Sequence, residues 1–140
     1  RRNIMADRLF VEEKVIDLFR NLTLASYTKK PDIKTQPFSE LKTTFLWAVS
    51  IGLREGKRLP LEGAREGLFR YSNLDREELS FIKIIALADT EDINILTDEN
   101  EDEVQKIAEE YANEGIRIIN EFLKNGSGDP LWKFVELLDT

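Results

Sequence analysis

The chain has 140 residues, of which 41% are hydrophobic and 34% charged, and its formal net charge is −7. It contains neither Cys nor His, which excludes disulfides, thiol nucleophiles, zinc ribbons, imidazole metal sites and Ser–His or Cys–His dyads. Carboxylates, Lys, Tyr, Ser and Thr remain for chemistry, so we expect a protein that is not an enzyme and needs no cofactor or metal.

The length predicts a single domain over residues 1–140, because a chain of this size can bury one sizeable core. No run of about 18 apolar residues occurs, so we expect no membrane span. Residues 1–6 are predicted to be a flexible segment without a signal-peptide core. The lack of Cys favours a reducing cytoplasm.

The charge is divided unevenly between the two halves of the chain. Residues 1–70 carry 14 Lys/Arg and 9 Asp/Glu, whereas residues 71–140 carry 6 and 18. The net charges are therefore +5 and −12. This polarity fits either a basic face for a polyanion or the gathering of acids on the solvent faces of C-terminal helices.

The first half predicts two helices and two loops. Apolar residues at three- and four-residue steps predict a helix from about Asp7 to Leu22. A loop with three lysines and two prolines follows over residues 23–37. Ser39 is a plausible N-cap for a buried second helix, which Gly52 and Gly56 end. Residues 54–74 form an irregular basic loop, in which residues 69–71 are a short strand or an extended segment.

The second half predicts longer helices. The segment 75–88 is predicted to be a helix, and the nearly all-apolar sequence in its interior places it in the core. A connector follows, with one short turn at 92–96. The longest helix runs from about 98 to 125, and Gly115 within it costs about 1 kcal/mol relative to Ala. The ordinary explanation is the close approach of another helix at Ala112 and Gly115; the alternative is a partner segment that packs there. A final short helix begins at Asp129-Pro130 and extends through Leu138.

The fold class is therefore an all-α, compact single-domain bundle of five to six helices with one irregular basic loop.

Two segments resemble known ligand-binding motifs but lack residues that those motifs require. The segment 52–58 lacks the spacing and the hydroxyl residue of a phosphate-binding loop. A calcium-loop pattern starting at Asp98 has Glu103 where the sharp turn needs Gly. Glu110 and Glu114 are one turn apart and are predicted to lie on a solvated face.

The basic loop is the candidate functional segment. Its guanidinium and ammonium groups can contact phosphates, and a neighbouring aromatic ring can stack on a base. The alternative is that these side chains pair with the acidic C-terminal half. The candidate contacts to a partner or to nucleic acid are Arg54, Lys57, Arg58, Arg65, Arg70 and Tyr71.

Three stretches resemble a known family. They are an aromatic-rich helix with a basic Gly-Lys-Arg-x-Pro-Leu turn at 44–61, an Ala-Asp-Thr connector at 85–92, and a Tyr-Ala-Asn-x-Gly helix at 109–115. Together they resemble small proteins encoded beside bacterial DNA phosphorothioation (Dnd) gene clusters, over residues 38–138. Tyr71 stands where such proteins commonly carry a Trp-containing segment.

The resemblance implies a cytoplasmic protein of a bacterial anti-phage or DNA-modification locus, and it transfers no catalytic residue. We expect a non-enzymatic adaptor that binds a larger defence-system protein. The alternative is a nucleic-acid-binding module that uses the basic loop at 54–70, so DNA is a possible partner. No membrane and no small-molecule ligand is implied.

Overall fold

The computed structural model of the chain describes residues 7–23, 38 and 40–124. In chain order these residues form two β-strands, four α-helices and four short 3-10 helices. The elements are β1 (Arg8–Glu12), η2 (Glu13–Val15), α1 (Ile16–Asn21), α2 (Leu41–Glu55), β2 (Arg65–Arg70), η3 (Tyr71–Asn73), α3 (Arg76–Thr90), η4 (Ile93–Leu96), η5 (Asp98–Asn100) and α4 (Glu101–Lys124).

The prediction of an all-α bundle of five to six helices is wrong in two respects, because the described residues form a two-stranded antiparallel sheet and four α-helices. β1 pairs with β2 with Leu9 opposite Phe69. The predicted first helix, 7–22, is helical only from residue 13 onward. Leu9 and Val11 are both buried whereas Arg8 is exposed, the alternation of a strand with one face on the core.

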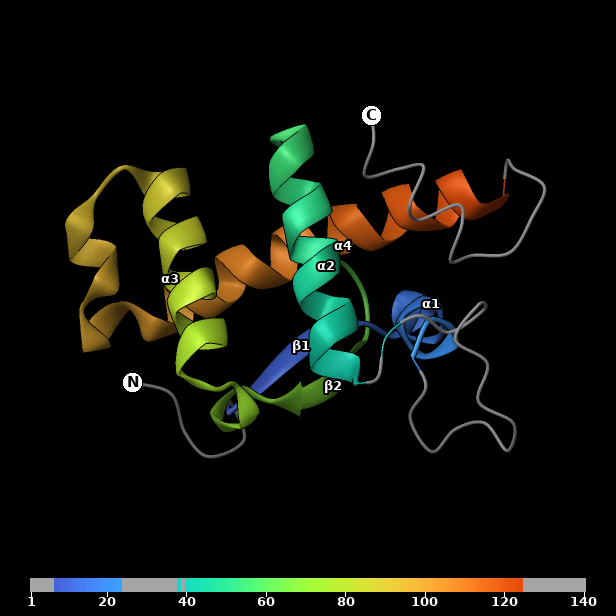
Figure 1. Cartoon of the computed structure of the whole chain (residues 1–140), viewed down its shortest axis with the longest axis horizontal. Helices are drawn as coiled ribbons and strands as arrows, with labels where there is room; N and C mark the ends of the chain where they lie inside the picture. The colour runs from blue at the N-terminus through green and yellow to red at the C-terminus, as the bar shows by residue number, and fades with distance from the viewer. Residues whose placement is uncertain (1–6, 24–37, 39, 125–140) are drawn as a thin grey trace.

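Helices α2 and α4 cross at close range (Figure 1). A Cβ atom on Gly115 would collide with the carbonyl of Ala48, and one on Gly52 would collide with the carbonyl of Tyr111. The predicted close approach of another helix at Gly115 is therefore confirmed. The prediction that Gly52 helps to end the second helix is wrong, since this residue lies inside α2 and its lack of a side chain serves the crossing.

The ends of the central helices follow from their sequences. α2 ends at Gly56, whose positive φ of 68° gives a left-handed C-cap. α3 begins with a capping box, in which Asp75 and Glu78 each accept a hydrogen bond from the other's backbone N–H. The predicted helix at 75–88 is confirmed as α3, and the turn at 92–96 as η4. The Ser39 N-cap, the loop at 24–37 and the final helix at 130–138 lie outside the described residues.

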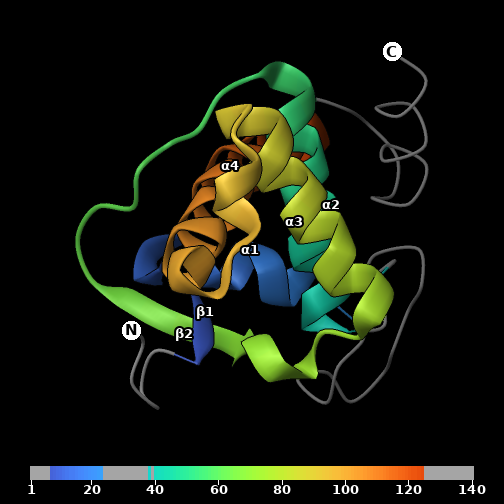
Figure 2. The ribbon, with the colours of Figure 1, turned by 90° about the vertical axis from the view of Figure 1, so that its left-hand side faces the viewer.

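The long α4 is the axis on which the other elements pack. It has 24 residues, or about 36 Å at 1.5 Å per residue. α2 and α3 cross it at different points along its length (Figure 1), and β1 also packs against it. The connection from α2 to β2, residues 56–64, runs around the outside of the molecule (Figure 2).

The core joins the helices to the sheet through aromatic rings. Phe45 on α2 stacks on Phe19 of α1 at 6.4 Å and meets the edge of Phe69 on β2 at 5.3 Å. Not all of the apolar interior predicted for 75–88 is core, because Ile84 is 63% exposed. None of the described helices combines the length and apolar character that crossing a bilayer requires.

Candidate functional site

The six residues predicted from the basic loop do not gather at one place. Arg54 and Lys57 stand at the C-terminal end of α2, whereas Arg65 and Arg70 are on β2, which lies near the opposite end of that helix (Figure 1). All four are exposed. The other two are not, since Arg58 is partly buried and Tyr71 is only 9% exposed.

Arg58 lies in a polar cluster between α3 and α4. Its guanidinium donates to the Asp89 carboxylate at 2.6 Å and to the Glu110 carboxylate at 3.0 Å. The hydroxyl of Tyr111 donates to the other oxygen of Asp89 at 2.5 Å. One arginine thus links the connection after α2 to the end of α3 and to the middle of α4.

The surroundings in this cluster raise the pKa of both Arg58 and Tyr111. Burial would lower the pKa of Arg58, but hydrogen bonds and attraction from Glu110 and Asp89 outweigh it and raise that pKa. Burial, with the hydrogen bond to Asp89, raises the pKa of Tyr111 to about 12. A phenol with so high a pKa is a poor nucleophile or general base near neutral pH.

The cluster is where the three sequence stretches at 44–61, 85–92 and 109–115 meet. The first stretch supplies Arg58, the second supplies Asp89, and the third supplies Glu110 and Tyr111. These four side chains therefore hold distant parts of the chain together.

A second buried cluster surrounds Glu12 at the end of β1, where this side chain is only 2% exposed. Its carboxylate accepts hydrogen bonds from the amide N–H of Glu62 at 3.0 Å, Asn113 at 2.8 Å and Arg117 at 2.8 Å. Burial alone would raise the pKa of Glu12, but these three donors outweigh it and lower the pKa to about 2. Asn113 also donates to the carbonyl of Leu59 at 3.0 Å, so this cluster fixes the connection between α2 and β2.

Sequence reasoning missed the carboxylates of these clusters. Glu110 was predicted to share a solvated face with Glu114, and this prediction is wrong because Glu110 is only 6% exposed. Glu109 is also buried, and its carboxylate accepts from the backbone N–H of Phe10 at 2.7 Å. A signal was present, since Glu110 lies three residues after the core residue Ile107 and so falls on the edge of the buried stripe.

The acids at the start of α4 serve the helix. Asp98 opens η5, and Glu101, Asp102 and Glu103 occupy the first turn of α4, where negative charge stabilises the helix dipole. Within residues 7–23, 38 and 40–124, no group of carboxylates is arranged to hold a metal ion.

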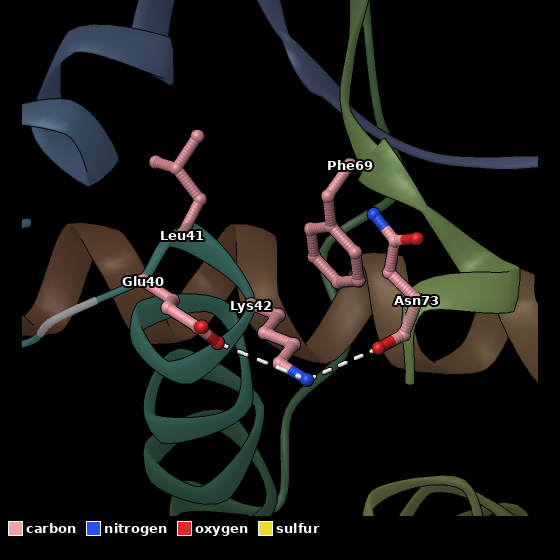
Figure 3. Close-up of a pocket in the computed structure, with 5 residues that line it drawn as sticks. All are labelled: Glu40, Leu41, Lys42, Phe69 and Asn73. Carbon is pink, nitrogen blue, oxygen red and sulfur yellow. Dashed lines mark hydrogen bonds and ion pairs between the residues drawn. The ribbon is translucent and has the colours of Figure 1, made fainter. Parts of the chain in front are cut away.

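A cavity of about 330 Å³ opens beside the start of α2 (Figure 3). Lys42, one of its lining residues, donates to the carbonyl of Asn73 at 3.0 Å and to Glu78 at 2.9 Å. The hydrogen bond to Glu78 raises the pKa of Lys42. This ammonium group therefore links α2 to α3 and is already satisfied by protein partners. The other lining residues are Glu40, Leu41, Phe69 and Asn73.

The comparison with known proteins gives one match. The profile of a family described as DNA sulphur modification system-associated protein 4 matches residues 17–139, which is most of the chain. No curated protein and no solved structure matches significantly. The resemblance to proteins of Dnd gene clusters is thereby confirmed, and the chain belongs to the family of DNA sulphur modification system-associated protein 4.

Proposed function

We propose that this protein is a non-enzymatic accessory protein of a bacterial anti-phage system linked to DNA sulphur modification. In this proposal it acts in the cytoplasm as an adaptor that binds a larger protein of the system. Membership of the family ties the chain to the modification system. The proposal of an adaptor role rests on the contacts that the buried polar side chains make with one another.

One observation carries the proposal. Four polar side chains from the three family-like stretches satisfy one another, with Arg58 between the carboxylates of Asp89 and Glu110, and with Tyr111 donating to Asp89. A catalytic group needs an open position at which substrate can meet it. The side chains of this cluster are instead held in internal ion pairs and hydrogen bonds, which make the fold rigid. A rigid protein that belongs to a system of several proteins is suited to act as an adaptor between them.

Recovery of the protein from its own bacterium tests this proposal. A tagged chain expressed from its native locus is purified before and after nuclease treatment, and the bound proteins are identified by mass spectrometry. We expect a larger protein of the modification system to be recovered in both samples. Recovery of the chain alone would refute the adaptor role.

Direct binding of nucleic acid is the second candidate, and the sheet favours it. Arg8 and Arg70 are opposite each other in the β1–β2 register, and both are exposed. Two arginines placed side by side on one strand pair can each contact a phosphate of a nucleic-acid backbone. The chain-wide charge of −7 opposes this candidate.

Duplex binding measured at two salt concentrations separates the two candidates. Binding through phosphates weakens with salt at a slope of about −0.9 per neutralised phosphate. Arg70→Gln should lower that slope by about one, while Lys57→Gln, at the far end of α2, should leave it unchanged. The absence of binding at low salt would eliminate this candidate.

A further inference from the structure

Two large apolar side chains point into solvent in the acidic half of the molecule. Ile84 on α3 is 63% exposed and Ile93 at the start of η4 is 72% exposed. Across the described part of the chain they are the most exposed of the large apolar side chains. In soluble proteins a contiguous exposed apolar patch with a polar rim marks an interaction surface.

The position of Ile84 follows from the geometry of α3. The buried face of this helix carries Ile82 and Ile85, at 0% and 2% exposure. Successive residues turn by about 100° around a helix axis, so Ile84 lies about 200° from Ile82. It therefore belongs to the outer face, which neither α4 nor η4 covers. The exposed residues of that face are Glu77, Ser80, Ile84, Ala88 and Glu91.

The segment that presents Ile93 is held by its own hydrogen bonds. The Asp92 carboxylate accepts from the backbone N–H of Asn94 at 3.0 Å, and the Asn100 amide donates to the carbonyl of Asn94 at 2.8 Å. Thr97 donates to the same carbonyl at 3.0 Å. A surface whose shape is fixed in advance loses little conformational entropy when a partner binds.

The segment from Ile84 to the first turn of α4 carries charge of a single sign, between Lys83 and Lys106. Residues 84–105 contain eight Asp or Glu and no Lys or Arg. Glu91, Asp92, Asp98 and Glu99 are exposed. These four form no ion pair with any other described residue, so their charge is available to a partner. A surface of this kind repels nucleic acid and attracts a cationic protein segment.

We propose that the outer face of α3, together with η4 and η5, docks a cationic, amphipathic segment of a partner protein. The partner places apolar side chains on Ile84 and Ile93 and places Lys or Arg against the surrounding carboxylates. This inference rests on the proposed adaptor function, because it names the surface and the chemistry through which the adaptor recognises its partner.

The test uses the full-length chain and the separately purified proteins of the DNA sulphur modification system from the same bacterium. Dissociation constants are measured for the wild type, for Ile84→Ser with Ile93→Ser, and for Glu91→Gln with Glu99→Gln. A matched control, Glu55→Gln with Glu62→Gln, removes the same charge from exposed positions on other elements. Circular dichroism verifies that each variant is folded.

We expect the apolar double variant to bind at least about tenfold more weakly, as exposed apolar anchors at interfaces do when they are removed. The acidic double variant should bind several-fold more weakly and show a smaller salt dependence, whereas the control binds as the wild type does. A carbodiimide, which joins carboxylates directly to amines, should link this acidic surface to lysines of the partner.

Other outcomes overturn the inference in distinguishable ways. If a partner binds the wild type and every variant equally, or cross-links elsewhere, the docking surface is wrong and the adaptor function stands. If the acidic surface cross-links to a second copy of this chain, self-association replaces the proposed partner. If no protein of the system binds the wild type, the adaptor function fails, and this inference fails with it.

Discussion

The substitution Glu12→Gln tests whether the buried carboxylate at the end of β1 holds the fold together. Its carboxylate accepts three hydrogen bonds, from Glu62, Asn113 and Arg117, and is 2% exposed. Glutamine keeps the shape and one acceptor oxygen but removes the charge. The guanidinium of Arg117 then faces a neutral partner, and one acceptor site becomes a donor.

The magnitude follows from the pKa. Glu12 has a pKa of about 2 in the folded protein against an ordinary value of 4.5. One pKa unit corresponds to about 1.4 kcal/mol, so the carboxylate contributes about 3 kcal/mol at neutral pH. Because the folded pKa is the lower of the two, this contribution is complete above about pH 5 and is lost as the pH falls toward 2. At pH 3 about half of it remains.

Urea denaturation at pH 7 and pH 3 provides the measurement. We expect the free energy of unfolding of Glu12→Gln to lie about 2–3 kcal/mol below the wild type at pH 7, with the difference roughly halved at pH 3. The control is Glu66→Gln. The Glu66 side chain is 48% exposed, and its carboxylate lies 3.8 Å from the guanidinium of Arg20, which is a long distance for an ion pair. The loss of such a surface pair should change the free energy of unfolding by less than about 1 kcal/mol. A Glu12→Gln protein as stable as the wild type at pH 7, or a difference that does not vary with pH, would refute the reasoning.

Three further substitutions test the crossing and the buried polar groups. Gly115→Ala should destabilise by about 3 kcal/mol in urea titrations, since the added methyl group collides with the carbonyl of Ala48 and outweighs the better helix propensity of Ala. Tyr111→Phe should cost about 1–2 kcal/mol and remove a slowly exchanging hydroxyl proton from the NMR spectrum, because Asp89 loses its 2.5 Å donor. Gln105→Met should leave the thermal midpoint unchanged or raise it, because Gln105 is 1% exposed and its side-chain oxygen accepts no hydrogen bond within the described part of the chain.

A shared control for these three is Lys106→Ala, an exposed position on α4, which should stay within about 0.5 kcal/mol of the wild type. Gly115→Ala with wild-type stability would mean that α2 and α4 are farther apart than described. A clear loss of stability in Gln105→Met would mean that the Gln105 amide has a partner.

Local signals were enough to predict the helices that carry strong caps and periodicity. Asp75 and Glu78 mark the start of α3 as a capping box, and Gly56 marks the end of α2. The small residue Gly115 in a long helix predicted the crossing, because only a close neighbour compensates for its low helix propensity. In each case the residues that decide the structure lie within a few positions of one another.

The strand β1 could not be predicted in the same way. Val11 and Val15 lie at helical spacing, so the apolar pattern of residues 8–12 fits a helix as well as a strand. What makes the segment extended is its pairing with β2, in which Leu9 meets Phe69 sixty residues later. A partner so distant leaves no mark in the local pattern.

The candidate site was predicted only in part for the same reason. The sequence singled out Arg58 as a cation but gave no means to pair it with Asp89 and Glu110, which lie 31 and 52 residues away. The predicted alternative, that basic side chains pair with the acidic half, describes Arg58 correctly. Its exposed neighbours Arg54 and Lys57 remain candidate contacts.

The cluster around Glu12 has a consequence for how the protein is made. Glu12 leaves the ribosome about a hundred residues before its partners Asn113 and Arg117. Contacts so distant in sequence slow folding, and here they also delay it until most of α4 has been synthesised. Until then β1 lacks the helix that packs against it, and a nascent chain stalled before residue 113 would leave the apolar side chains of β1 open to aggregation or to a chaperone.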